Sequence, residues 1–205
     1  LAGNLKATKE AAYGAATAIC TTDLVRKTLA VEVDLGGGGL LGGRKVRIGG
    51  MGKGSGMIHP NMATMLGVVT CDANVDPEAW RAMVKRASIN SFNQISVDGD
   101  TSTNDTVLLL ASGSAGPADP GALGAALAEA CLSLAVQMAD DAEGSTKTVF
   151  LSVTGAADDA EAASEPTLAT VGFADIAGFT RLTRVMADED VAQMVQAFES
   201  GAADI

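Results

Sequence analysis

The sequence predicts an α/β domain in which helices pack on a mixed β-sheet. Short apolar runs of strand length alternate along the chain with longer segments whose apolar residues recur at helical spacing. Glycine- and proline-rich turns separate them, in the order helix, hairpin, strand, helix, strand, helix, strand. The 205 residues suffice for one domain with a sizeable core, or for one domain and part of another.

The first third of the chain predicts a helix followed by a β-hairpin. Residues 6–19 are rich in alanine and contain Gly14 as their only glycine, which favours a helix. Residues 30–35 alternate valine with acidic residues, and residues 45–48 alternate basic with apolar residues, so both are predicted to be half-buried strands. Residues 36–43 are so rich in glycine that we expect them to form the hairpin loop.

The middle of the chain predicts a buried strand and a core-facing helix. The apolar run at residues 65–70 predicts the strand. Asp76 and Pro77 then supply an N-cap and a first-turn proline. After them, apolar residues recur at helical spacing: Trp80, Met83, Val84 and Ala87. We interpret this face of the helix, including the tryptophan, as packing surface.

A strand, a long helix and a final strand complete the predicted domain. Residues 106–112 are apolar and predict the first of these strands. Asp119 and Pro120 begin the helix. Its predicted buried face consists of Leu123, Leu127, Cys131, Leu134 and Met138. Residues 147–153 predict the final strand, and from Gly155 onwards the composition becomes small and acidic.

Charge and composition argue against several classes of partner. The net charge of −11 disfavours nucleic acid and an anionic membrane surface. No signal peptide is visible, and no apolar run reaches the roughly 18 residues of a membrane helix. Cys20, Cys71 and Cys131 are odd in number and lack metal-ligand spacing, which favours reduced thiols and a cytoplasmic location. Because the first residue is leucine, we expect the chain to begin inside a longer protein.

The stretch from Lys53 to Gly67 holds the main candidate for chemistry. A glycine-rich loop with one lysine leads into Thr64, at the mouth of the 65–70 strand. A threonine hydroxyl is a weak nucleophile unless a base lies beside it, and cutting the preceding bond would free the α-amino group of the same residue as that base. The alternative is a polar residue that merely begins a strand, and the residue types alone leave both open.

Two segments resemble the ornithine acetyltransferase (glutamate N-acetyltransferase) family of arginine biosynthesis. Residues 53–66, KGSGMIHPNMATML, are similar to the self-cleavage segment of that family, and residues 89–106, INSFNQISVDGDTSTNDT, are similar to a second signature. The resemblance implies that the precursor cuts itself between Ala63 and Thr64. The new N-terminal threonine would then carry an acetyl group from N-acetylornithine to glutamate, with its own amino group as general base.

The same resemblance implies further substrate-binding residues. Besides Thr64, these are Thr21, the first threonine of a Thr-Thr-Asp sequence, and Lys53. Glu143 matches an acidic contact, expected at the amino groups of ornithine. This chain has Ala142 where the family usually has glycine, so the turn that presents Glu143 would be strained if that position needed a positive φ.

The resemblance also implies small-molecule partners and no cofactor for acetyl transfer, with acetyl-CoA as a second possible donor. The cleaved chains are expected to form a heterotetramer. The family's Thr-Gly oxyanion pair, and a C-terminal asparagine and hydroxyl residue that bind substrate, are expected to lie outside residues 1–205. Because losing one oxyanion donor costs about 10²–10³ in rate, we expect this chain by itself to be inactive.

The end of the chain predicts a different segment. The acetyltransferase resemblance covers residues 1–163, and a boundary is expected at residue 164. Residues 167–205 resemble the start of a class III adenylate or guanylate cyclase domain. In that family the counterpart of Asp175 holds a metal pair, with the carbonyl of Ile176 as a second contact, and such oxygen ligands suit Mg²⁺ or Mn²⁺. A metal is expected only if the cyclase segment were complete.

Three functions therefore stay open at the level of sequence. They are an acetyltransferase, a nucleotide cyclase module, and a non-functional chimeric or truncated product. A calcium loop is weaker still, because residues 98–104 alternate acids with polar residues but lack the glycine and glutamate that an EF-hand places at fixed positions. A turn held by side-chain to backbone hydrogen bonds is the favoured alternative there.

Overall fold

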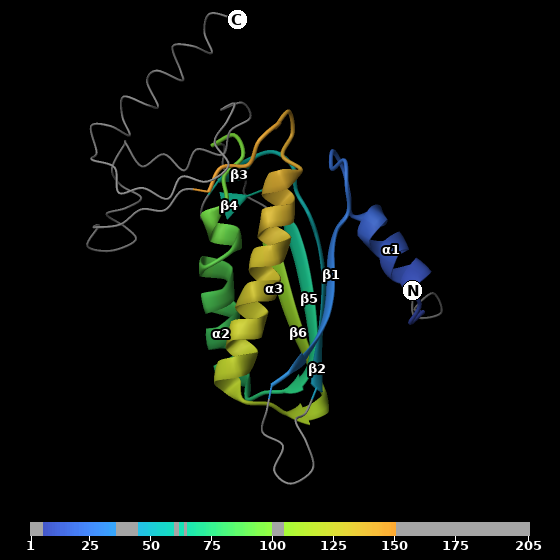
Figure 1. Cartoon of the computed structure of the whole chain (residues 1–205), viewed down its shortest axis with the longest axis vertical. Coiled ribbons are helices and arrows are strands. Elements are labelled where there is room, and N and C mark those ends of the chain that lie inside the picture. The colour runs from blue at the N-terminus through green and yellow to red at the C-terminus, as the bar shows by residue number, and fades with distance from the viewer. Residues whose placement is uncertain (1–5, 36–44, 60–61, 64, 100–104, 151–205) are drawn as a thin grey trace, which may run out of the picture. The chain divides into compact units, whose positions relative to one another are not determined.

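The computed structural model describes most of the first three quarters of the chain. The described residues are 6–35, 45–59, 62–63, 65–99 and 105–150. The chain divides into two compact units, residues 1–143 and residues 144–205. All helices and strands of the described part lie in the first unit (Figure 1).

Four strands form a mixed sheet in the order β1-β2-β5-β6. They are β1 (Lys27–Asp34), β2 (Lys45–Lys53), β5 (Leu66–Asn74) and β6 (Thr106–Pro117). β1 pairs antiparallel with β2, and β2 with β5, whereas β5 and β6 run parallel. The pairing of Asp34 with Lys45 confirms the predicted hairpin, while residues 36–43 of its loop lie outside the described part.

Two helices cover one face of the sheet. α2 (Pro77–Ile89) connects the parallel strands β5 and β6, and α3 (Pro120–Asp140) follows β6. Figure 1 shows α2 and α3 side by side on this face, with α1 (Lys9–Ala18) on the other side of the sheet. Both predicted N-caps are confirmed, because the Asp76 carboxylate accepts the N–H groups of Glu78 and Ala79, and Asp119 accepts that of Ala122.

The core lies between α2, α3 and the inner face of the sheet. The five residues predicted to form the apolar face of α3 are all fully buried: Leu123, Leu127, Cys131, Leu134 and Met138. Trp80 packs against this core and donates its indole N–H to the carbonyl of Leu109 at 3.2 Å, as its predicted packing role requires. A Cβ on Gly50 would lie 2.9 Å from Cδ1 of Leu134, so α3 packs where β2 presents no side chain.

Helix α3 corrects one statement made from the sequence. Among the described residues it is long and apolar enough, by length and composition, to cross a membrane: 21 residues, with a mean hydropathy of 1.6 in its most apolar window. A count of unbroken apolar runs misses this helix, because Glu129, Ser133 and Gln137 interrupt its apolar residues. The buried leucine face on the sheet explains the high hydropathy, because the core helix of a globular unit has the same composition.

Other differences from the predicted elements occur at strand ends and in short segments. Residues 147–150 form no strand, and the rest of the strand predicted at 147–153 lies outside the described part. β2 continues five residues beyond Ile48, through a glycine-rich stretch, because β1 and β5 pair with it on both sides. The two-residue strands β3 (Ile58–His59) and β4 (Met62–Ala63), and the 3₁₀ turn η2 (Phe92–Gln94), were not predicted.

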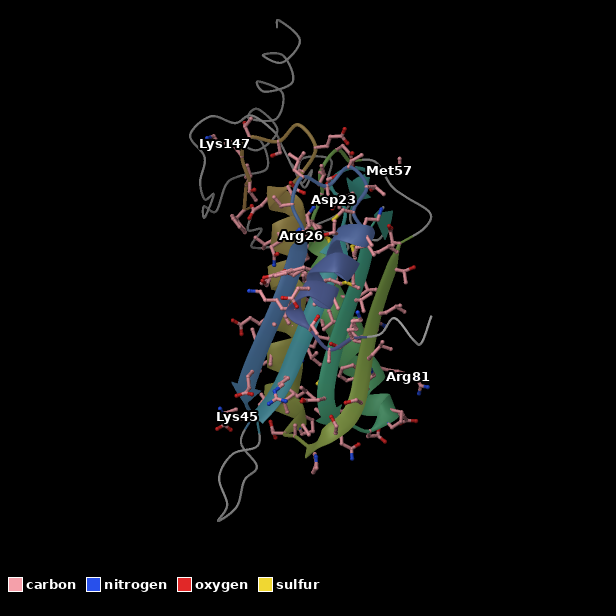
Figure 2. All side chains as sticks on the ribbon, turned by 90° about the vertical axis from the view of Figure 1, so that its right-hand side faces the viewer. Asp23, Arg26, Lys45, Met57, Arg81 and Lys147 are labelled. Carbon is pink, nitrogen blue, oxygen red and sulfur yellow. The ribbon has the colours of Figure 1, made fainter. Side chains whose placement is uncertain are left out.

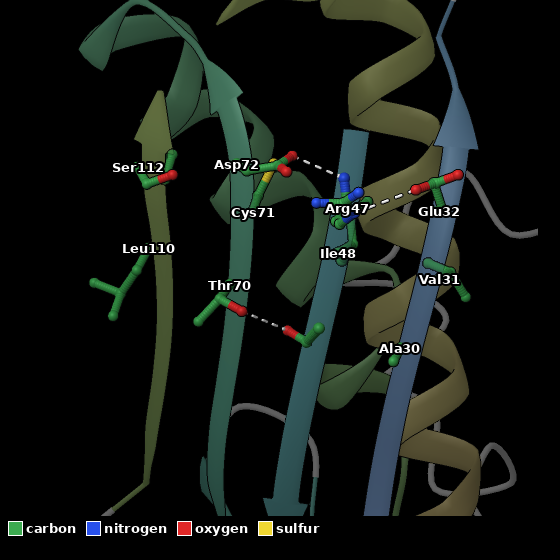
Figure 3. A pocket seen from close by; sticks show the side chains of 12 residues that line it. Ala30, Val31, Glu32, Arg47, Ile48, Thr70, Cys71, Asp72, Leu110 and Ser112 are labelled. Carbon is green, nitrogen blue, oxygen red and sulfur yellow. Dashed lines mark hydrogen bonds and ion pairs between the residues drawn. The ribbon is translucent and has the colours of Figure 1, made fainter. Parts of the chain in front are cut away.

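The outer face of the sheet is partly open. A hollow of about 660 Å³ lies over this face and is lined by residues of all four strands, among them Ala30, Gly49 and Thr70 (Figure 3). Glu32 there accepts hydrogen bonds from Lys45 at 2.8 Å and Arg47 at 3.2 Å, and these bonds lower the pKa of the Glu32 carboxyl. These ion pairs of Glu32 are exposed to solvent, and exposed pairs of this kind contribute little to stability.

The three cysteines are free, as predicted. Burial raises the pKa of the Cys131 thiol to about 11 and also raises the pKa of Cys71. Both thiols therefore stay protonated near neutral pH and act as small apolar core residues.

Candidate active site

The loop that follows β2 brings the predicted cleavage point back toward the sheet. The turn at residues 54–57 leads from Lys53 into β3, and β3 pairs antiparallel with β4. In this pairing Ile58 lies opposite Ala63, the residue on the N-terminal side of the predicted cut. Thr64 itself lies outside the described residues.

The second signature segment holds the backbone after residue 64 directly, and the backbone before it through β3, which pairs with Ala63. The N–H of Met65 donates to Oδ1 of Asp105 at 2.9 Å, and the carbonyl of Met65 accepts the N–H of Thr106 at 3.1 Å. On the other side, the carbonyl of Ile58 accepts the N–H of Val97 at 2.8 Å. The two sequence signatures, 53–66 and 89–106, are therefore adjacent in space and hydrogen-bonded to each other.

Asp98 holds the turn at its strained point. Met57 has φ 56°, the only positive φ among the described residues other than glycine. Oδ2 of Asp98 accepts the N–H of Met57 at 2.5 Å, and Oδ1 accepts the N–H of Ile58 at 3.2 Å. The Asp98 carboxylate is thus used by the backbone of a distant turn. Residues 100–104 lie outside the described part, so the predicted turn at 98–104 and its calcium alternative stay predictions.

Asp105 carries the one buried side-chain oxygen without a hydrogen-bond partner in the described part of the chain, Oδ2. Burial raises the pKa of the Asp105 carboxyl, and the bond from the Met65 N–H and the charge of Lys53 only partly oppose this. Unpaired buried carboxylate oxygens are costly and rare, and a carboxyl group whose pKa is perturbed by burial is a candidate for a functional site. Asp105 therefore joins the candidate site, because it accepts the N–H of Met65, the residue after Thr64.

We expect Asp105→Asn to change how stability depends on pH. Since the folded pKa lies above 3.8, folded protein retains a proton that unfolded protein has lost, and wild-type stability decreases as pH rises from 3.8 through the raised pKa. The Asn variant lacks this decrease, so its unfolding free energy should gain on wild type as pH rises above 3.8. Paired urea titrations across this range measure the gain, and a constant difference would contradict the prediction.

A buried lysine lies between two aspartates at the same end of the sheet. The ammonium of Lys27 contacts Oδ1 of Asp23 at 2.5 Å and Oδ2 of Asp141, the C-cap residue of α3. The side chains of Lys27 and Asp23 are 0% exposed, and that of Asp141 is 5% exposed. We call these three residues the Lys27 cluster. Figure 2 shows Asp23 and Met57 at one end of the sheet and Lys45 at the other.

Both aspartates of the Lys27 cluster also accept backbone N–H groups. Asp23 accepts those of Gly54 at 2.8 Å and Thr21 at 3.1 Å. Asp141 accepts those of Leu24 at 3.0 Å and Val25 at 3.2 Å. Burial alone would raise the pKa of Asp23, but the bonds from Gly54, Lys27 and Thr21 together outweigh it and lower that pKa.

The structure brings together the segments that carry three predicted substrate-binding residues. Thr21 is bonded through its own N–H, and Lys53 precedes the bonded Gly54. The N–H of Glu143 donates to the carbonyl of Ser55 at 2.5 Å. Thr21 and Glu143 are exposed and Lys53 is half-buried, so their side chains remain accessible. Asp175 and Ile176, predicted as metal ligands, lie outside the described residues.

The strain considered at Ala142 is absent. Ala142 does not have a positive φ, and it is buried next to Glu143. A nearby residue with a positive φ, Gly144 at 73°, is a glycine. The alanine is thus compatible with the turn that presents Glu143.

Sequence reasoning missed Lys27, Asp141 and Asp105 as parts of the site. Lys27 and Asp141 are 114 residues apart, and nothing in their local sequence shows that they meet. Asp105 did fall within a recognised signature, so its position directly before an apolar strand was an available signal.

Comparison with known proteins gives the family. The model of the ArgJ family matches residues 1–169. The chloroplastic arginine biosynthesis bifunctional protein ArgJ of Ostreococcus lucimarinus is 55% identical over 170 residues, which cover 79% of this chain and 36% of that protein. The ArgJ protein of Parasynechococcus marenigrum is 55% identical over 151 residues, covering 72% of this chain and 35% of that protein.

A crystal structure of the ArgJ protein of Bacillus halodurans is 41% identical, with a TM-score of 0.42, and the match covers 46% of this chain and 47% of that one. The chain spans about a third of the length of the curated relatives that it matches. With a family match over more than three quarters of its length, the chain belongs to the ArgJ family.

Proposed function

We propose that this chain supplies the self-cleaving part of an acetyltransferase of arginine biosynthesis, which moves acetyl from N-acetylornithine to glutamate. Family membership and the name of the relatives, arginine biosynthesis bifunctional protein ArgJ, support the pathway. One observation carries the assignment to this part of the chain. The backbone on either side of residue 64 is fixed, by pairing at Ala63 and by hydrogen bonds at Met65.

The proposed chemistry begins with cleavage. The hydroxyl of Thr64 attacks the carbonyl of Ala63, the acyl group moves from nitrogen to oxygen, and water hydrolyses the resulting ester. The freed α-amino group of Thr64 then takes the hydroxyl proton as that oxygen attacks the acetyl carbonyl of N-acetylornithine. Ornithine leaves with the proton, and the amine of glutamate removes the acetyl group from Thr64 in the second half-reaction.

Three accessible side chains have charges and donors that suit these substrates. The ammonium of Lys53 can pair with a substrate carboxylate, and the carboxylate of Glu143 with an amino group of ornithine. Thr21 adds a hydroxyl at the same end of the sheet. Acetyl transfer by this route uses no metal or organic cofactor. Use of acetyl-CoA as an alternative donor, and a heterotetramer of cleaved chains, belong to the same proposal.

A hybrid enzyme provides the test. Residues 1–169 of this chain replace the matched segment of the Parasynechococcus marenigrum protein, which supplies the rest of the family's length. We expect intact mass to show a cut between Ala63 and Thr64, and the purified hybrid to transfer acetyl from N-acetylornithine to glutamate. Brief exposure to the donor alone should add one acetyl group to the fragment that begins at Thr64.

Substitutions separate the role of Thr64 from that of any nearby threonine. Thr64→Ala should give one uncut chain without transfer, whereas Thr70→Ala, which removes a hydroxyl on the outer face of β5, should leave both intact. A hybrid that transfers acetyl while uncut would refute the mechanism. A folded hybrid that neither cuts nor transfers would refute the proposed function.

The other functions considered from the sequence gain no support from the described residues. Residues 170–205 lie outside both the family match and the described part, so the cyclase resemblance and the boundary at residue 164 stay predictions. A cytoplasmic location also stays an expectation. The names of several relatives place those proteins in the chloroplast.

A further inference from the structure

We propose that the Lys27 cluster is the positioning device of the substrate site: Asp23, Lys27 and Asp141 lock the segments of Thr21, Lys53 and Glu143 into one arrangement. The inference rests on the proposed function for the identity of the substrate. None of the three cluster residues is exposed enough to contact substrate itself. They act through the backbone of the residues that do.

Asp23 connects two of these segments. Its Oδ2 accepts the N–H of Thr21 at 3.1 Å, and its Oδ1 accepts the N–H of Gly54, directly after Lys53, at 2.8 Å. Lys27 contacts the same Oδ1 at 2.5 Å. The two oxygens of one carboxylate thus fix where the Thr21 segment and the end of β2 lie relative to each other.

Asp141 connects the third segment. It is the C-cap residue of α3, two residues before Glu143, and its Oδ2 accepts hydrogen bonds from the N–H groups of Leu24 and Val25 and from the Lys27 ammonium. The N–H of Glu143 in turn donates to Ser55, whose hydroxyl lies 2.7 Å from that of Thr22. The end of α3, the 21–25 segment and the 54–55 turn therefore form one closed set of polar contacts.

The burial of three charged residues in the Lys27 cluster indicates that the cluster positions the segments around it. A buried ion pair contributes little net stability compared with well-packed apolar residues, but it demands a specific geometry. In the Lys27 cluster the two carboxylates accept N–H groups from the 21–25 segment and from Gly54. These segments carry or adjoin the accessible side chains of Thr21 and Lys53. A shift of about 1 Å in a substrate-binding group can lower the rate of an enzyme about 10²-fold. A rigid support for such groups therefore helps to maintain the rate.

The test uses Asp23→Asn in the 205-residue chain, with Glu32→Gln as the control for loss of an exposed carboxylate. Asn keeps the shape of the side chain but not its charge. We expect faster amide hydrogen exchange at Thr21, Gly54 and Glu143, while the protection of Leu134 and its neighbours in α3 is retained. Glu32→Gln should leave all of these amides unchanged. Uniform loss of protection, or none, would overturn the inference.

A kinetic measurement tests whether the Lys27 cluster affects the binding of substrate. In the hybrid enzyme, Asp23→Asn should lower kcat/KM for N-acetylornithine by about 10–100-fold, mainly through KM, with the cut at Ala63–Thr64 still made. A purely structural role predicts a lower melting temperature and an unchanged KM well below it, and that result would overturn the inference. A wild-type hybrid without transfer would instead refute the proposed function, and hydrogen exchange would still decide the role of the cluster.

Discussion

Replacing Lys27 by methionine is expected to lower the free energy of unfolding by about 3–5 kcal/mol. Methionine fills a similar volume, but it leaves the carboxylates of Asp23 and Asp141 buried without their shared cation. Their remaining partners, the backbone N–H groups, do not neutralise two negative charges. Urea unfolding of the 205-residue chain, followed by circular dichroism, measures the loss.

Two comparisons show whether unpaired charge is the cause. Lys45→Met removes a lysine of the exposed pair with Glu32 at the far end of the sheet, and it should have a much smaller effect. The triple variant Lys27→Met, Asp23→Asn, Asp141→Asn removes all three charges and should recover part of the loss. Equal losses for Lys27→Met and Lys45→Met, or no recovery in the triple variant, would show that charge burial is not responsible.

Leu134→Ala is expected to cost about 2–5 kcal/mol. Leu134 is fully buried in the centre of α3, and its Cδ1 reaches the space over Gly50. Truncation leaves a cavity between α3 and β2 that the rigid sheet cannot close. The same urea titration measures the cost, with exposed Leu132→Ala on the same helix as the control.

A double-mutant cycle tests the contact between Leu134 and Gly50. Gly50→Ala alone should destabilise the fold by about 1–3 kcal/mol, because the new Cβ meets Leu134 Cδ1 at 2.9 Å. In the Leu134→Ala background the clashing methyl is gone and the cavity accepts the new carbon, so the double variant should lose less than the sum of the two. Strict additivity would contradict this packing.

Much of the fold could be predicted because its signals are local. Asp76-Pro77 and Asp119-Pro120 mark helix starts wherever the surrounding chain goes, and the leucine face of α3 follows from spacing alone. The apolar runs that form β5 and β6 are likewise predicted as strands from their own length and composition. The predicted site residues, by contrast, came from resemblance to a family, and spacing alone would have left Thr64 as an ordinary strand residue.

The remaining features depend on contacts between distant parts of the chain. The short β3–β4 pair exists because Asp98 and Val97 hold Ile58, some 40 residues earlier. Lys27 begins strand β1, and its burial depends on Asp141, which reaches its ammonium from the C-cap of α3 and completes the site begun by the nearby Asp23. A single sequence contains no local pattern for either event.

The strand order determines which elements each product of the proposed cut would contain. A break between Ala63 and Thr64 leaves β1 and β2 in one product and β5, β6 and both core helices in the other. Since β2 is hydrogen-bonded to β5 and lies under α3, the products remain two halves of a single sheet. Scission would thus free a new chain end within an assembly that the β2–β5 pairing holds together.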